Sequence, residues 1–298
     1  MAIAPDAALA SLRSVFGHED FRPGQADAVA AQLQGRDVLS VAPTGSGKSI
    51  SYWVPALLGG GLTLVVSPLI ALMQDQVSRL RGLGVAAGFV NSTLPPDLQS
   101  RQLDEAEEGA LRLLYVAPER FASRAFMSRV GRLGVSRMVV DEAHCISSWG
   151  HAFRPDYRRL GQAVEACGRP PVAAFTATAT PRVREDIVAS LGLRHPAVFV
   201  TGFNRPNLRL SARRCRGEEG KSAELLRILD PGAGRALVYA GTRKASEELA
   251  QRIRARGLAA AAYHAGLPDQ ARREAQDAFA AGRLRVVVAT NAFGMGVD

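Results

Sequence analysis

The stretch D-V-L-S-V-A-P-T-G-S-G-K-S (37–49) decides the fold class, because it joins a run of aliphatic residues to a glycine-rich turn and then to a plausible helix. Such a turn lets backbone N–H groups approach phosphates, and the start of the helix favours their negative charge. Lys48 would reach the β and γ phosphates of a nucleotide, and Ser49 would ligate Mg²⁺. The strict pattern has glycine where Ala42 stands, so an ordinary glycine-rich turn is the alternative.

Short aliphatic runs alternate with longer segments of helical character on both sides of this stretch, a pattern typical of βαβ units and a parallel sheet. Two α/β lobes are expected, separated by the turn-rich string G-F-N-R-P-N-L (202–208). The expected strands are 37–41, 62–66, 111–116, 137–140 and 171–176 in the first lobe, and 208–212, 235–239, 260–263 and 285–290 in the second, where 245–256 and 270–281 are expected helices.

Charge and composition indicate the class of partner and exclude other classes. The 298 residues include 37 Lys and Arg against 28 Asp and Glu, a net charge of +9, which favours a polyanionic partner. The longest apolar stretch, 56–73, is broken by glycines and a proline, so no bilayer span is expected. The three cysteines form no C-x-x-C pair and the five histidines show no metal-ligand spacing, so we expect a cytoplasmic protein without zinc.

A second chemical motif, D-E-A-H (141–144), follows the apolar run at 138–140. A carboxylate at the carboxyl end of a buried parallel strand lies on the same sheet edge as a phosphate loop. Asp141 would bind Mg²⁺, and Glu142 would orient or deprotonate the attacking water. The alternative is a solvated acidic start of a helix.

Aromatic residues are 6% of the chain, yet Trp149, Phe153 and Tyr157 occur within nine positions, interleaved with Arg154 and other arginines. Aromatic rings stack on unpaired bases, and arginines neutralise the phosphate backbone. A local aromatic cluster that anchors the loop to the core is an equal alternative from composition.

Three further strings carry weaker signals. F-R-P-G-Q (21–25) offers Gln25 and Arg22 to an adenine ring, or is only a loop at a helix start. T-A-T-A-T (176–180) would place its three threonines on one strand face, suited to hydrogen bonds across a cleft, or is a half-buried strand end. A-T-N-A-F-G-M-G-V-D (289–298) is a close backbone approach to phosphate or a structural turn.

Taken in order, these strings resemble the superfamily 2 helicases, and specifically the RecQ family of DNA helicases. The resemblance covers nearly the whole chain. It also runs through S-P-L-I-A-L-M-Q-D-Q (67–76), Y-V-A-P-E-R (115–120), A-H-C-I-S-S-W-G-H-A-F-R-P-D-Y (143–157), G-F-N-R-P-N-L (202–208) and Y-H-A-G-L (263–267).

The resemblance implies an α/β fold with a RecA-like P-loop NTPase lobe at 1–203, a linker at 204–215 and an incomplete second RecA-like lobe at 216–298. It implies ATP-dependent 3′ to 5′ DNA unwinding in recombination and repair, with ATP and Mg²⁺ as cofactors. The implied partners are single-stranded and 3′-tailed or forked DNA, and a single-stranded-DNA-binding protein. A monomer associated with the nucleoid, if the source is bacterial, is expected.

The resemblance also implies roles for individual residues. Catalysis falls to Lys48, Asp141 and Glu142, with Ser49 and Asp141 on Mg²⁺. The nucleotide would be bound by Arg22, Gln25, Thr44, Gly45, Ser46, Gly47, Lys48 and Ser49. DNA binding and its coupling to ATP turnover fall to His144, Trp149, Phe153, Arg154, Tyr157, Thr176, Thr178, Asn204, Arg205 and Thr290.

The family continues with an arginine-containing motif that would lie beyond Asp298 and face the ATP. An arginine finger contributes about 10³- to 10⁵-fold to turnover, so we expect the chain as given to hydrolyse ATP poorly. Two other functions stay open: an ATP-binding, single-stranded-DNA-binding module without efficient unwinding, and an RNA helicase of the same superfamily.

Overall fold

The computed structural model describes residues 5–149, 153–202, 207–229, 234–291 and 293. Internal contacts divide the chain into two compact units, Met1–Asn204 and Arg205–Asp298. The predicted linker, 204–215, begins at the boundary between the two units along the sequence. Its exact bounds stay a prediction, because part of it lies outside the described residues.

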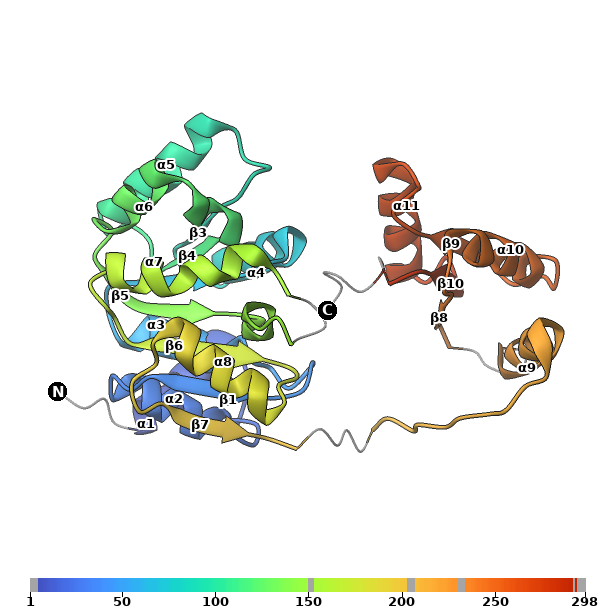
Figure 1. Cartoon of the computed structure of the whole chain (residues 1–298), viewed down its shortest axis with the longest axis horizontal. Helices are drawn as coiled ribbons and strands as arrows, with labels where there is room; N and C mark the ends of the chain where they lie inside the picture. Colours follow the sequence, from blue (N-terminus) through green and yellow to red (C-terminus); the bar gives the residue numbers. More distant parts are fainter. Residues whose placement is uncertain (1–4, 150–152, 203–206, 230–233, 292, 294–298) are drawn as a thin grey trace. The chain divides into compact units, whose positions relative to one another are not determined.

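A parallel sheet of seven strands forms the centre of the first unit (Figure 1). Its order is β3-β4-β2-β5-β6-β1-β7, so the strands are connected by crossovers, as expected of an α/β fold. The strands are β1 (Val38–Val41), β2 (Leu62–Val66), β3 (Ala87–Val90), β4 (Leu113–Val116), β5 (Val135–Val140), β6 (Val172–Thr176) and β7 (Ala197–Val200).

Helices cover both faces of this sheet. Helices α1 to α4 pack into one buried cluster, and α5 to α8 with the 3₁₀ turns pack into a second cluster on the other face. The helices are α1 (Pro5–Phe16), α2 (Gln25–Leu33), α3 (Ile50–Leu58), α4 (Ile70–Gly82), α5 (Pro96–Glu107), α6 (Arg124–Val130), α7 (Leu160–Ala166) and α8 (Pro181–Leu191). The 3₁₀ turns are η1 (Pro118–Ala122), η2 (Ala143–Ile146) and η3 (Pro155–Arg159).

The aliphatic runs become strands because neighbouring side chains enter opposite clusters. Val38 packs with the α1 to α4 cluster, and Leu39 packs with the other. Val65 and its neighbour Val66 divide in the same way, and all four side chains are buried. A strand covered on both faces needs apolar residues at every position, which explains continuous runs in place of alternation.

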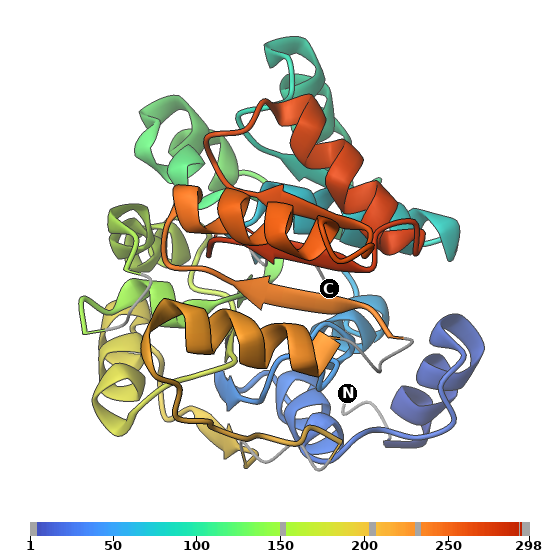
Figure 2. The same cartoon turned by 90° about the vertical axis from the view of Figure 1, so that its right-hand side faces the viewer.

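The second unit contains a parallel three-stranded sheet of order β8-β10-β9 (Figure 2). Residues of α9 and α10 pack on one face of this sheet, and residues of α11 pack on the other. The elements are α9 (Gly217–Leu229), β8 (Ala236–Tyr239), α10 (Arg243–Arg254), β9 (Ala260–Tyr263), α11 (Asp269–Ala280) and β10 (Val286–Ala289).

The predicted α/β class with two parallel-sheet lobes is confirmed, and eight of the nine expected strands coincide with observed ones. The strand expected at 208–212 is wrong: this stretch is irregular, and Leu210 is 92% exposed. Leu208 and Leu210, with Arg209 between them, are both exposed and pack against no buried cluster of the described residues, so the stretch forms no ladder. Strands β3 and β7 were not expected.

Asp37, directly before β1, anchors one end of the first sheet. Its buried carboxylate accepts hydrogen bonds from the backbone N–H of Val172 at 2.8 Å and of Arg194 at 2.7 Å. The Arg169 guanidinium lies 2.6 Å from the same carboxylate. Burial by itself raises the pKa of Asp37, but these donors outweigh it, and the pKa is lowered below 3.8. The ionised carboxylate therefore joins the starts of β1 and β6 to the segment before β7.

We expect Asp37→Asn to reduce the free energy of unfolding by about 2–4 kcal/mol, because the amide cannot accept from all three donors and the half-buried Arg169 loses its nearest anion. Urea unfolding at neutral pH measures the loss. Asp20→Asn is the control, since the Asp20 side chain is 80% exposed and 3.7 Å from Arg13. Equal effects of the two substitutions would contradict this role for Asp37.

The stabilisation by Asp37 should also depend on pH in one direction. Because the pKa of Asp37 is lower in the folded state, its contribution is complete above the unfolded value near 3.8 and is lost as the pH falls through the folded value. The difference in unfolding free energy between wild type and Asp37→Asn should therefore be constant from about pH 7 to 5 and narrow below about pH 4. A difference that widens on acidification would contradict the assignment.

Candidate functional site

The order of three neighbouring strands gathers the predicted site residues at one sheet edge. Strand β6 lies between β5 and β1, and all three are parallel, so their carboxyl ends meet. Just past these ends, the backbone N–H of Asp141 donates to Val66 O at 2.8 Å, and that of Ala42 donates to Thr176 O at 3.0 Å. The phosphate-loop and D-E-A-H segments therefore leave the same edge of the sheet, on either side of the end of β6.

The glycine-rich turn has the backbone that a phosphate loop needs. Gly45 and Gly47 have φ angles of 78° and 80°, which side chains with a Cβ rarely adopt. A Cβ added to Gly47 would lie 2.7 Å from Nε2 of Gln25, so a side chain at this position would displace the Gln25 amide. Lys48 Nζ donates to Ala42 O at 3.3 Å, inside the turn. Among the described atoms, the buried Ser46 Oγ has no hydrogen-bond partner.

The side chains of Gln25 and Arg22 hold this turn through hydrogen bonds to its backbone carbonyls. The Gln25 side-chain amide donates to Ser46 O at 3.0 Å and to Gly47 O at 2.9 Å, and its oxygen accepts from Arg22 N at 2.8 Å. The Arg22 guanidinium donates to Gly45 O at 2.6 Å. Both predicted adenine-contacting residues therefore lie beside the loop, and their contact with adenine stays a prediction.

Two residues that sequence reasoning did not assign surround the Ser49 hydroxyl. Gln76 Nε2 donates to Ser49 Oγ at 3.1 Å, and the Tyr52 hydroxyl lies 3.1 Å from Gln76 Oε1 and 3.4 Å from Ser49 Oγ. Gln76 belongs to the string at 67–76, which carried a family signal but no role for any single residue. These contacts orient the hydroxyl that is predicted to ligate Mg²⁺.

The D-E-A-H segment forms a tight turn at the end of β5. Glu142 has a left-handed φ of 48°, and its N–H donates to Asp141 Oδ1 at 2.9 Å. His144 Nδ1 lies 3.3 Å from Glu142 Oε2 and 2.8 Å from Thr176 Oγ1. His144 therefore joins the acidic turn to the end of β6.

The threonines of 176–180 do not share one face, so that expectation is wrong. Strand β6 ends at Thr176, which is fully buried, and the chain turns there because Thr176 Oγ1 accepts from Thr178 N at 3.4 Å. Thr178 is exposed, and Thr180 caps α8 by accepting from Val183 N. The period of two holds only while the strand continues.

The aromatic segment after η2 divides into exposed and buried rings. Trp149 is 62% exposed, and its backbone N–H donates to Ser147 Oγ at 3.2 Å. Phe153 is half-buried, and Arg154 donates from its backbone to Cys145 O and from its guanidinium to Pro68 O, at 2.9 and 3.1 Å. Residues 150–152 lie outside the described residues.

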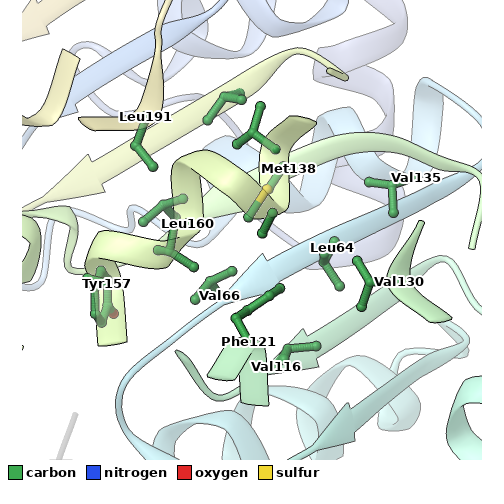
Figure 3. Packing of buried hydrophobic residues seen from close by; sticks show 14 of the residues in the cluster. Leu64, Val66, Val116, Phe121, Val130, Val135, Met138, Tyr157, Leu160 and Leu191 are labelled. Carbon is green, nitrogen blue, oxygen red and sulfur yellow. The ribbon is translucent and has the colours of Figure 1, made fainter. Parts of the chain in front are cut away.

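Tyr157 is fully buried, so the prediction that a base stacks on its ring does not fit the structure. Its hydroxyl donates to Asp141 O at 3.0 Å, and its ring belongs to the cluster that also contains Val66, Phe121 and Leu160 (Figure 3). A base cannot stack on a ring in this position. For Tyr157 the alternative interpretation, an aromatic residue that holds the loop to the core, describes the structure.

The remaining predicted site residues lie elsewhere in the chain. Thr290 follows β10 in the second unit, where its N–H donates to Tyr263 O at 3.1 Å. Asn204, Arg205 and most of the string at 289–298 lie outside the described residues. In the described part of the chain, no group of three His, Cys, Asp or Glu side chains could hold a metal ion. None of the described helices has the length and hydropathy needed to cross a bilayer.

Comparison with known proteins assigns the family. The DEAD/DEAH box helicase model matches residues 22–187, and the helicase conserved C-terminal domain model matches 220–298. The ATP-dependent DNA helicase RecQ of Pasteurella multocida is 41% identical over 98% of this chain, and that of Bacillus subtilis is 40% identical over 96%. The chain belongs to the RecQ family of DEAD/DEAH box helicases. It spans 46% and 49% of the lengths of these two relatives.

Solved helicase structures share the fold. Mycobacterium smegmatis Lhr bound to single-stranded DNA and AMP-PNP matches 99% of this RecQ-family chain and 43% of its own, with a TM-score of 0.72 at 22% identity. The helicase MrfA bound to DNA and AMPPNP has the same score at 20% identity, over 99% of this chain and 44% of its own. At these identities the similarity concerns the fold, two RecA-like lobes.

The environment of His144 generates a testable titration. Burial by itself lowers the pKa of the imidazole, but hydrogen bonds with Cys145 and Glu142 and the charge of these groups raise it to about 9. We expect histidine NMR to show this pKa, and Glu142→Gln to lower it because an anion is removed. The pKa of His144 in the folded state lies above the value of 6.5 expected in the unfolded state. Protonated His144 therefore contributes its full stabilisation of the fold below pH 6.5, and this stabilisation is lost as the pH rises through about 9. Titration near 6.5 in both proteins would exclude this network.

Proposed function

We propose that this chain forms the ATP-driven motor of a DNA helicase of the RecQ family. One observation carries the proposal: the phosphate loop and the acidic turn follow β1 and β5, the two strands that flank β6, and His144 joins the acidic turn to β6 at 2.8 Å. The same buried turn supports the aromatic segment, because Tyr157 donates to the carbonyl of Asp141. A nucleotide-dependent change at Asp141 would therefore reach the segment that is proposed to contact DNA.

The described residues fit a nucleotide with Mg²⁺. The unpartnered Ser46 hydroxyl and the left-handed glycines leave a polar cradle, and Lys48 supplies a compact cation within it. Residues 44–49 would bind the phosphates, and Ser49 with Asp141 would hold Mg²⁺. When bound, the nucleotide supplies the free energy that drives movement along DNA. Glu142 is proposed to orient the attacking water and accept its proton.

DNA contact is proposed for exposed and half-buried residues beyond the sheet edge. Trp149 and Phe153 offer rings on which bases could stack, and Thr178 offers a hydroxyl. Arg154 offers a positive charge for a phosphate, on the guanidinium that also donates to Pro68 O. His144, Tyr157 and Thr176 would couple this contact to ATP turnover from buried or half-buried positions. Similar contacts are proposed for Asn204, Arg205 and Thr290. The net charge of +9 and the DNA helicase names of the relatives support DNA as the partner.

The wider role follows from the family and is proposed with it. Single-stranded DNA and 3′-tailed or forked duplexes are the proposed substrates, with unwinding from 3′ to 5′ in recombination and repair. A monomer acting in the cytoplasm, associated with the nucleoid if the source is bacterial, together with a single-stranded-DNA-binding protein, is the proposed setting. Zinc is not part of the proposal for this chain.

The proposal is tested by ATP hydrolysis with and without single-stranded DNA, and with single-stranded RNA of equal length. DNA should stimulate turnover more than RNA, and Lys48→Ala should reduce the stimulated rate by about 10²-fold or more, because the phosphate charge loses its cation. Lys244→Ala is the matched control, since its ammonium is exposed and lies 3.8 Å from Glu248 in the second unit. Preferential stimulation by RNA would favour an RNA helicase, and binding of ATP without stimulation would favour a non-motor module.

A further inference from the structure

Trp149 is held by a residue from a different part of the chain. Cζ of Arg182, in the first turn of α8, lies 3.3 Å from the centroid of the Trp149 ring. This distance places the planar guanidinium against one face of the indole. The Trp149 side chain nevertheless remains 62% exposed, so a large part of its surface faces solvent.

Arg182 contacts Trp149 although a possible ion-pair partner, Asp186, lies on the same helix. Arg182 and Asp186 are four residues apart on α8, a spacing that favours an ion pair along a helix. The Asp186 carboxylate instead accepts the Ser147 hydroxyl at 2.6 Å, and Ser147 Oγ accepts from Trp149 N at 3.2 Å. Asp186 therefore fixes the backbone of the aromatic segment while Arg182 lies on its ring.

The position of Arg182 in α8 adds a second argument. A helix begins with a partial positive charge, so a cation in the first turn is unfavourable for the helix. Thr180 caps α8 and Pro181 starts it, which already satisfies the helix terminus. Helix stability gives no reason for an arginine at 182, whereas the stack on Trp149 does.

We propose that Arg182 is a positioning residue, whose guanidinium holds the Trp149 indole as a preformed platform on which a base of single-stranded DNA stacks. The proposal rests on the proposed function, because it deepens the role of the aromatic segment in DNA contact. A free tryptophan side chain loses rotational freedom when a base stacks on it, and a platform that is already held loses less. Arg182 acts on the face of the ring away from the base.

The planarity of the guanidinium distinguishes this role from simple charge attraction. Arginine stacks flat on an aromatic face, whereas the ammonium of lysine is a compact, strongly hydrated charge. Arg182→Lys therefore keeps the charge that a phosphate would meet but loses the stack. A residue that serves only through charge would tolerate this substitution.

The experiment measures binding of a fluorescently labelled oligothymidylate by anisotropy at several salt concentrations. We expect Arg182→Lys and Arg182→Ala to weaken binding about three- to tenfold, with Arg182→Lys leaving the dependence of affinity on salt unchanged. Arg36→Ala is the matched control: it removes an exposed arginine before β1, at the opposite end of the strand from the site, and should keep the affinity. Thermal unfolding verifies that each variant is folded.

A second readout reports the ring directly. Acrylamide quenching of Trp149 fluorescence, after subtraction of the signal of the buried Trp53 measured in Trp149→Phe, should increase in Arg182→Lys. Wild-type affinity and quenching in Arg182→Lys would overturn the proposal. Trp149→Ala distinguishes failure of the proposed DNA contact from failure of the positioning role. If Trp149→Ala also binds the oligonucleotide normally, the proposed DNA contact of the aromatic segment is wrong. If only the Arg182 variants bind normally, only the positioning role of Arg182 is wrong.

Discussion

The backbone ladder between parallel strands is the constraint on which the candidate site depends. Two bonds continue it beyond the strand ends, from Asp141 N to Val66 O at 2.8 Å and from Ala42 N to Thr176 O at 3.0 Å. They fix where the acidic turn and the phosphate loop begin, before any side chain contributes. Because β6 separates β5 from β1, Thr176 lies between the two motifs, and its hydroxyl is the position where His144 can connect them.

Buried polar contacts extend this connection toward the surface. The Tyr157 hydroxyl donates to the Asp141 carbonyl, so η3 is attached to the acidic turn. Ser147 donates to Asp186, which attaches the segment after η2 to α8. In a buried setting each of these bonds is costly to break unless a new partner replaces it. The aromatic segment is therefore supported at both ends by elements of the nucleotide-binding edge.

The sequence predicts those features that depend on neighbouring residues and misses those that depend on packing. The phosphate loop and the D-E-A-H turn follow buried aliphatic runs, which show strand ends directly. Gln76 and Ser49 are 27 residues apart, and their contact exists only because α3 and α4 pack on the same face of the sheet. Likewise, composition cannot separate the exposed Trp149 from the buried Tyr157, because both are aromatic residues of one arginine-containing segment. The strand expected at 208–212 is the opposite case: the local sequence indicates a strand, but the apolar residues have no surface to pack against and no strand forms.

The bracing of the phosphate loop links adenine contact to the state of the loop. The Gln25 amide has two N–H hydrogens, and both are used by the carbonyls of Ser46 and Gly47. Its oxygen accepts from Arg22 N and keeps one lone pair, enough to accept from the adenine amino group. Donation to adenine N7 would require the amide to release a loop carbonyl. Gln25 can therefore form two hydrogen bonds with adenine only if the phosphate loop rearranges. Contact with the base and contact with the phosphates then both depend on the conformation of this loop.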